Sequence, residues 1–257
     1  MEVGEAARSA RRWPAALFVV RHGESLGNVA RDAAQLARAD RIAVEGRDVD
    51  VALSALGERQ AGALGRWFAD MPAAERPDTL LVSPYARAIS TARAVRDAGG
   101  VAGEVPLCVD ERLREKEFGI LDGLTTSGVA NLLPEQAEFR RILGKFYHRP
   151  PGGESWCDVI LRLRSVLDTI ALHHAGRRVL IVAHQVVVLC LRYVIENLDE
   201  ERLLAIDRAG DVANCSVTEY RLVPGEGLVL ARYNHAVPLE REAVPVTDAN
   251  DRAGVRG

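Results

Sequence analysis

The sequence of 257 residues contains no apolar run close to the roughly 18 residues that indicate a membrane-spanning helix. Its first apolar run, residues 15–20, is much shorter and follows Arg8, Arg11 and Arg12. No clear small-residue cleavage site of a secretory signal peptide follows this run. We interpret the first residues as an irregular start that leads into a strand, and we expect no membrane partner.

An excess of positive charge is also absent. The 33 Lys and Arg residues are outnumbered by 36 Asp and Glu residues, and the formal net charge is -3. Proteins that bind nucleic acid usually carry a basic patch or a cationic run, because phosphate neutralisation dominates their affinity. The sequence therefore predicts no nucleic-acid partner, and nothing in it specifies an oligomeric state.

Cysteine is scarce and scattered. Cys108, Cys157, Cys190 and Cys215 are the four cysteines, and no two of them have the C-x-x-C spacing of zinc or redox sites. Three of them lie in segments with apolar periodicity, which predicts buried thiols. This pattern favours a reducing, cytoplasmic location and predicts no metal site.

What the sequence does contain is an alternation of strand-like and helix-like segments. A βαβ alternation predicts a mainly parallel sheet with helices on both faces, and thus the α/β class. The apolar strand patterns cover residues 16–20, 79–83 and 177–184. The helical patterns run from the first strand to about residue 40, and over residues 56–70, 85–98 and 155–174.

The chain is predicted to form a single domain over residues 1–240. With 48% hydrophobic residues, it can bury the core of one large domain. Residues 119–149 are irregular apart from a helical piece near 136–145, and we expect them to form a cap over one end of the sheet. Residues 241–257 are rich in Pro, Gly and charge, which predicts a flexible C-terminal tail.

Two predicted strands each lead directly into a histidine, His22 and His184. In open parallel sheets, ligands bind beyond the carboxyl ends of the strands, so both imidazoles are expected at one edge. Arg21 precedes His22, and Arg87 lies one turn into the helix that follows the strand at 79–83. Guanidinium groups suit the spread charge of a phosphoryl group, which predicts a phosphate site.

Helix starts are predicted at the same edge. Ser83 is expected as an N-cap with Pro84 in the first helical position, and Ser25 with Asn28 forms a second start signal. A third start, which the sequence does not assign to this edge, is predicted at Ser155, which has the spacing of a capping box with the residue three positions later. The exposed amides of such helix starts favour a bound anion.

Four motifs in this order, "RHGES", "SPYARAISTA", "LREKEFG" and "VAH", closely resemble the histidine phosphatase superfamily, whose fold is also called phosphoglycerate mutase-like. The resemblance extends from about Leu17 to Tyr220. It implies a three-layer α/β/α sandwich with a helical cap insertion. It also implies that His22 is the nucleophile that becomes phosphohistidine, and that Arg21, Arg87 and His184 bind the phosphoryl oxygens.

The resemblance further implies that Glu115 donates the proton to the leaving group and that Asn28 contacts the phosphate. In such chemistry a neutral imidazole attacks phosphorus while guanidinium groups stabilise the equatorial oxygens, so no metal or other cofactor is required. The acid must be protonated, and partial burial should raise its pKa. A neighbouring carboxylate, Glu117, is an alternative for the same role.

The superfamily contains both phosphatases and mutases, and three departures favour hydrolysis. Leu26 and Gly27 stand where mutases typically carry a tryptophan before the asparagine, the segment after the acid lacks their lysine, and Gln185 follows the second histidine where they usually have Gly-Asn. The histidine-glutamine pair and "RPPGGESWCDVILRL" look more like the bisphosphatase domain that hydrolyses fructose 2,6-bisphosphate. We expect Gln185 to contact substrate.

We therefore predict a metal-independent phosphomonoesterase that acts through phosphohistidine on a small phosphorylated metabolite. The alternatives are a cofactor-dependent phosphoglycerate mutase and an inactive phosphate-binding member, although every acid, base and cation position is intact. The cap also carries several cationic and aromatic residues that either reach a second anionic group or form a solvated helix face: Arg140, Arg141, Lys145, Tyr147, His148 and Arg149.

Overall fold

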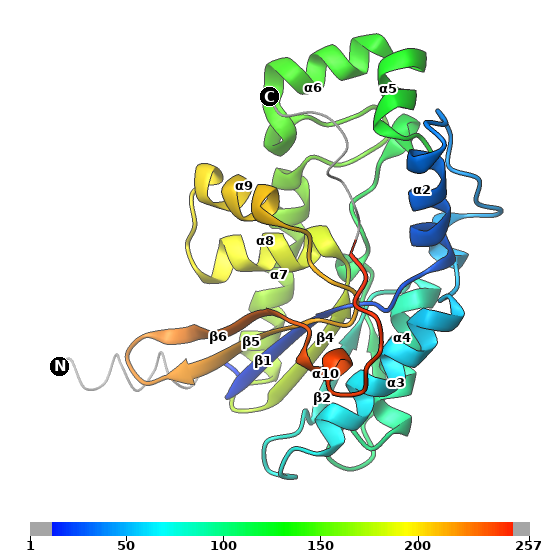
Figure 1. Ribbon diagram of the computed structural model, residues 1–257. Coiled ribbons are helices and arrows are strands. Elements are labelled where there is room, and N and C mark those ends of the chain that lie inside the picture. Colours follow the sequence, from blue (N-terminus) through cyan, green and yellow to red (C-terminus); the bar gives the residue numbers. More distant parts are fainter. Residues whose placement is uncertain (1–11, 249–257) are drawn as a thin grey trace.

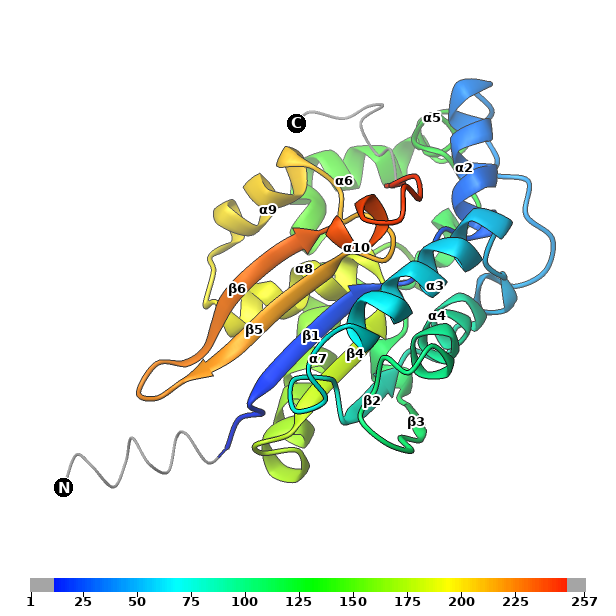
Figure 2. The same ribbon diagram turned by 60° about the horizontal axis from the view of Figure 1, so that its bottom comes forward.

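A six-stranded sheet forms the centre of the structure, a computed structural model that describes residues 12–248. The strand order is β3-β2-β4-β1-β5-β6, and Figure 2 shows the strands side by side. The first four strands in this order run parallel to one another. Strand β5 pairs antiparallel with β1, and β6 pairs antiparallel with β5. The strands are β1 (Ala16–Arg21), β2 (Thr79–Val82), β3 (Leu107–Val109), β4 (Arg178–Ala183), β5 (Val217–Val223) and β6 (Gly227–His235).

The predicted strands correspond to β1, β2 and β4. All six residues of β1 are buried, because this strand lies between β4 and β5 and is covered by helices on both faces. Strands β3, β5 and β6 lie outside the predicted strand patterns. The loop between β5 and β6 contains the turn signal Pro-Gly at Pro224 and Gly225, which would have indicated this hairpin.

Helices cover both faces of the sheet, which confirms the three-layer α/β/α prediction (Figure 1). Leu17 and Val19 of β1 belong to the core formed with α7 and α8, whereas Phe18 and Val20 belong to the core formed with α3 and α4. This alternation follows from the two-residue period of a strand. The helices of these layers are α3 (Ala55–Ala69), α4 (Ala86–Asp97), α7 (Trp156–His173), α8 (Gln185–Ile195), α9 (Glu200–Ala209) and α10 (Val237–Glu240).

A group of helices stands beyond the sheet, at the top of the view in Figure 1. It comprises α2 (Leu26–Leu36), α5 (Thr126–Leu132) and α6 (Pro134–Tyr147), of which the last two lie within the predicted cap. Gly144 interrupts α6 with a φ of 77°, a conformation that favours glycine. Short 3₁₀ helices span Asp48–Asp50, Glu111–Leu113 and Gly119–Leu121.

Two of the three predicted helix starts are confirmed. Ser25 and Ser155 are N-caps, and each forms a capping box with the residue three positions later. The start at Ser83 was wrong, because α4 begins at Ala86 with Tyr85 as its N-cap. The extended backbone of Tyr85 delays the helix, and the Ser83 hydroxyl accepts from the Tyr85 amide at 3.3 Å and contacts a histidine. The prediction of buried thiols was also wrong for Cys108, which is exposed on the edge strand β3.

Part of the segment expected as a tail lies against the rest of the domain. The amide of Asn214 donates to the Thr247 carbonyl oxygen at 2.8 Å, and the Gln60 side chain donates to the Pro245 carbonyl oxygen at 2.9 Å. Residues 249–257 lie outside the described residues. Within residues 12–248, no helix is long and apolar enough to cross a membrane.

Candidate active site

The two histidines meet at the carboxyl ends of neighbouring strands. Strands β1 and β4 pair in parallel with Arg21 opposite Ala183, so the residues that follow each of them emerge at the same edge. The ring centroids of His22 and His184 lie 5.1 Å apart. The topology thus creates the juxtaposition that the sequence predicted.

His22 is held in the form that a nucleophile needs. Its Nδ1 lies 2.7 Å from the Gly23 carbonyl oxygen, which can only accept, so Nδ1 carries the proton. The lone pair of Nε2 then accepts from the Nε–H of Arg87 at 3.2 Å. Burial, with Arg87 and Arg21 adding to it, lowers the pKa of His22 well below its ordinary value. The imidazole is therefore neutral at neutral pH.

Close backbone contacts fix the loop that carries His22. The backbone amide of Gly23 donates to the Thr91 hydroxyl at 3.0 Å, and a Cβ on Gly23 would lie 2.6 Å from the Gly57 carbonyl oxygen. A Cβ on Gly57 would in turn overlap the Glu24 carbonyl oxygen. Helix α3 can therefore approach the His22 loop only because both positions are glycine.

Gly57→Ala should therefore lower both stability and turnover. Forcing a methyl group against the Glu24 backbone is expected to reduce the free energy of unfolding by about 1–3 kcal/mol, the usual cost of overpacking. It should also displace the His22 loop and reduce kcat. Denaturant unfolding and steady-state kinetics measure the two effects. Gly62→Ala, in the same helix, is the control, since its Cβ meets only the Arg66 side chain, at 3.3 Å; equal effects of both variants would contradict the prediction.

His184 lies deeper than His22 and is also neutral. One ring nitrogen, Nε2, lies 2.7 Å from the Ser83 hydroxyl. The other, Nδ1, is buried and has no hydrogen-bond partner within the described residues. Burial, followed by Arg87 and His22, lowers the pKa of His184 well below its ordinary value. Buried ring nitrogens usually have a hydrogen-bond partner, so Nδ1 retains the capacity for one more hydrogen bond.

Two buried guanidinium groups supply positive charge. Arg21 donates to the Val212 carbonyl oxygen. Burial lowers the pKa of Arg21 to about 10, so it remains charged at neutral pH. The guanidinium of Arg87 lies over the Tyr85 ring, 4.7 Å from its centroid. These cations lie beside His22 and can stabilise the charge of a phosphoryl group.

Glu115 is influenced by the charges of the same two arginines. Its Oε1 accepts from the Lys116 backbone amide at 2.8 Å. Burial raises the pKa of Glu115, although the Lys116 amide and the charges of Arg87 and Arg21 oppose this shift. Glu117, the alternative acid, is exposed and forms a salt bridge with Arg114 at 3.5 Å. The environment thus favours Glu115 over Glu117 as a proton donor.

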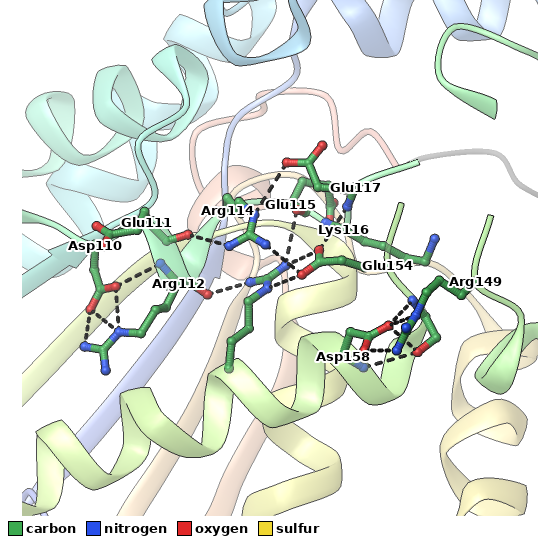
Figure 3. Close-up of polar contacts among 12 residues, drawn as sticks. Asp110, Glu111, Arg112, Arg114, Glu115, Lys116, Glu117, Arg149, Glu154 and Asp158 are labelled. Carbon is green, nitrogen blue, oxygen red and sulfur yellow. Dashed lines mark hydrogen bonds and ion pairs between the residues drawn. The ribbon is translucent and has the colours of Figure 1, made fainter. Parts of the chain in front are cut away.

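A network of ion pairs and hydrogen bonds holds the Glu115 loop (Figure 3). No part of this network was predicted from the sequence. Arg162 of α7 donates to the Glu115 carbonyl oxygen at 3.2 Å and pairs with Glu154 at 2.9 Å. Glu154 also pairs with Arg114 at 2.8 Å and accepts from the Glu117 amide at 3.0 Å. Glu154 belongs to the sequence motif "GGES", and this motif could have indicated the network.

Asn28 and Gln185 have other partners in this structure. The side-chain oxygen of Asn28 accepts from the Ser25 amide at 3.0 Å and so caps α2. Gln185 donates to Asp211 at 2.8 Å, and its side-chain oxygen is buried without a partner among residues 12–248. Neither residue bonds to His22 here, and their substrate contacts stay predictions.

Lys116 is a further cation beside the acid. It is buried, and its Nζ lies 4.6 Å from the centroid of the Phe118 ring. Burial, together with the charge of Arg140, lowers the pKa of Lys116 to about 8. No role was predicted for this position, and the segment "FGILDGLTTSG" that follows it offers no cation. The position of this lysine directly after the predicted acid could have indicated a cation at the site.

Several of the cap cations are paired with carboxylates. Lys145 contacts Asp207 at 2.7 Å, Arg141 pairs with Glu138 at 2.6 Å, and Arg149 pairs with Asp158. These pairs favour a structural role for the three cations. Arg140 and His148 form no ion pair within the described residues, and Nε2 of the buried His148 has no partner there.

No metal centre accompanies these groups in the described part of the chain. Within residues 12–248, no three His, Cys, Asp or Glu side chains are grouped as metal ligands would be. The charged groups that act on His22 are instead the guanidinium groups of Arg87, Arg21 and Arg31. This set of groups can bind an anion.

Comparisons with known proteins identify relatives over most of the chain. The family model of the histidine phosphatase superfamily (branch 1) matches residues 17–235. The probable phosphoglycerate mutase GpmB of Yersinia enterocolitica is 29% identical over 204 residues, which cover 79% of this chain and 82% of that protein.

Solved structures show the same fold. YhfR of Bacillus stearothermophilus superposes with a TM-score of 0.65 at 27% identity, covering 86% of this chain and 96% of that one. The native structure of a mycobacterial glucosyl-3-phosphoglycerate phosphatase has a TM-score of 0.65 at 25% identity, covering 86% of this chain and 98% of that one. The relatives thus include proteins named as phosphatases and as mutases.

Proposed function

Because the chain belongs to the histidine phosphatase superfamily (branch 1), we propose that it is a metal-independent phosphomonoesterase. It forms a phosphohistidine at His22 and acts on a small phosphorylated metabolite. The observation that carries this proposal is the neutral His22, whose Nε2 accepts from Arg87 at 3.2 Å. A neutral imidazole beside fixed cations is the arrangement that in-line phosphoryl transfer requires.

In the first step, Arg21, Arg87 and His184 hold the oxygens of the phosphoryl group. The lone pair on His22 Nε2 attacks phosphorus, and the bond from phosphorus to the ester oxygen breaks. Protonated Glu115 transfers its proton to that oxygen, so the alcohol leaves as a neutral molecule. The guanidinium groups stabilise the charge that spreads over the equatorial oxygens.

In the second step, Glu115 acts as a base. Its carboxylate takes a proton from water as the water oxygen attacks phosphorus, and the bond from phosphorus to His22 Nε2 breaks. Inorganic phosphate leaves, His22 returns to its neutral form and Glu115 is protonated again. Each cycle thus consumes one ester and one water and releases one alcohol and one phosphate.

A phosphoglycerate mutase is the second candidate, because the relative from Yersinia carries that name and because buried Lys116 places a cation beside the acid. A mutase must retain a bisphosphorylated intermediate and exclude water. The segment after the acid carries Thr125, Thr126 and Ser127 in place of the mutase lysine. Hydrolysis remains the better supported reaction on this ground.

A coupled mutase assay and a phosphate-release assay on one enzyme preparation, with a chelator present, test the proposal. We expect phosphate release from p-nitrophenyl phosphate and from members of a panel of phosphorylated metabolites. With 2,3-bisphosphoglycerate supplied, we expect at most trace interconversion of 3- and 2-phosphoglycerate, because the segment after the acid lacks the lysine that would retain a bisphosphorylated intermediate.

Either of two results would contradict this expectation. Isomerisation much faster than phosphate release would identify a mutase. Folded protein that is inactive on every ester over a broad pH range would identify a phosphate-binding member without catalysis.

A further inference from the structure

The phosphate-binding arginine is already occupied by an anion from its own chain. Asp48 lies in the 3₁₀ helix Asp48–Asp50, in the connection between α2 and α3. Both oxygens of its carboxylate accept hydrogen bonds from the guanidinium of Arg87, at 2.9 Å from one terminal nitrogen and 3.0 Å from the other. The Asp48 carbonyl oxygen accepts a further bond from Arg87 at 2.7 Å.

These contacts use most of the donors that Arg87 has. A guanidinium group carries five N–H bonds and no acceptor. One donates to His22, two from one terminal nitrogen donate to Asp48, and one from the other terminal nitrogen donates to the same carboxylate. One N–H bond of Arg87 has no partner within residues 12–248, so a phosphoryl group that attaches to His22 Nε2 can form a bidentate contact with Arg87 only by taking donors that Asp48 or His22 holds.

The two anions cannot share the site at low cost. A phosphoryl group is a dianion near neutral pH, and like charges within a few ångströms repel strongly in a poorly solvated site. The Asp48 carboxylate and the phosphoryl oxygens also require the same bidentate geometry on the guanidinium. One of them must leave when the other binds.

The structure indicates which partner moves. The Arg87 side chain is 6% exposed, whereas that of Asp48 is 43% exposed. Arg87 is anchored in α4 and lies over the Tyr85 ring, but Asp48 sits on a three-residue 3₁₀ helix in a connection. Displacing Asp48 breaks a contact on the solvent side, while displacing Arg87 would disrupt buried packing.

We infer that Asp48 is a built-in competitor for the phosphoryl group: it occupies Arg87 in the empty site, and substrate displaces it. This inference rests on the proposed role of Arg87 in binding the phosphoryl group. Because only the fraction of molecules with Asp48 displaced binds phosphate, the competitor weakens the apparent affinity for phosphate esters and for the product. Asp48 thereby sets how tightly the site holds phosphate and how readily product leaves.

The test is the affinity of the purified protein for inorganic phosphate, measured by titration calorimetry, with inhibition by orthovanadate as a second readout. Asp48→Asn should bind phosphate about 3- to 10-fold more tightly, the effect expected when a half-exposed ion pair no longer competes. Asp50→Asn is the matched control: it lies on the same 3₁₀ helix but pairs with exposed Arg47 at 2.8 Å. Its phosphate affinity should equal that of the wild type.

A positioning role for Asp48 predicts the opposite sign. Unchanged or weaker phosphate binding in both Asp48→Asn and Asp48→Ala, with normal circular dichroism, would overturn the inference. A parallel fall in kcat/KM would then show that Asp48 holds Arg87 in place for catalysis. The measurement needs no turnover, so tighter phosphate binding in Asp48→Asn would support the competitor even if the wild-type protein hydrolyses no ester.

Discussion

His22→Ala should fold normally and lose turnover of every phosphate ester by at least about 10⁴-fold, the scale on which removal of a covalent nucleophile acts. Nothing else in the described site carries an unprotonated nitrogen that accepts from Arg87, as His22 Nε2 does at 3.2 Å. Steady-state kinetics with p-nitrophenyl phosphate measure the loss. His173→Ala is the control, because His173 is exposed at the end of α7 and should leave turnover unchanged.

The covalent intermediate provides a second readout for the same variant. Phosphoenzyme trapped from the wild type should be labile in acid and stable in base, as a phosphoramidate is, and it should be absent from His22→Ala. An acid-stable adduct, or an adduct that persists in His22→Ala, would show that another residue is phosphorylated and that the assigned nucleophile is wrong.

Glu115→Gln should slow hydrolysis of alkyl phosphates by about 10²- to 10⁴-fold, the usual contribution of a general acid. Hydrolysis of p-nitrophenyl phosphate should slow less, because nitrophenolate leaves with little help from a proton. The matched control is Glu117→Gln, which removes an exposed carboxylate that pairs with Arg114. Steady-state kinetics of both variants on both substrates measure these effects. If Glu115→Gln slowed both substrates equally, Glu115 would not be the acid. If only Glu117→Gln lost activity, Glu117 would be the acid.

The pKa shifts of Glu115 and His22 predict the pH profile of kcat/KM. Burial raises the pKa of Glu115, so the protonated acid persists above the ordinary range of a carboxyl group, and activity should fall as pH rises through that pKa. Burial lowers the pKa of His22, so the loss on the acid side should begin well below the ordinary pKa of histidine. In Glu115→Gln, the alkaline limb should disappear while the acid limb remains.

The central strands could be predicted from the sequence because their pattern is local. Residues 16–20 form a continuous apolar run before Arg21 and His22, and residues 179–183 form another before His184; such runs are typical of strands buried on both faces. The capping boxes at Ser25 and Ser155 are equally local, since their partners lie three residues away. The Ser83 start failed because the backbone of Tyr85 stays extended, and the contact of the Ser83 hydroxyl with His184, 101 residues away along the chain, could not be read locally.

The candidate site was predicted in part for the same reason. Topology alone brings His22 and His184 to one edge once both strands are recognised as parallel neighbours. The support of Glu115 could not be read in this way, because Arg162 reaches its carbonyl oxygen from 47 residues further along the chain. The local periodicity of the sequence does not predict a contact between residues so far apart along the chain.

By itself, the sequence determined the α/β class, the central strands, two helix starts and the four ordered motifs of the superfamily, because each is written in residues within a few positions of one another. Only the tertiary structure decided that Asp48 grips Arg87 across 39 residues, that Lys116 is buried beside the acid, and that Glu115 lies in a poorly solvated environment. Electrostatic energies and pKa values depend on distance and burial in space, which the folded chain alone sets.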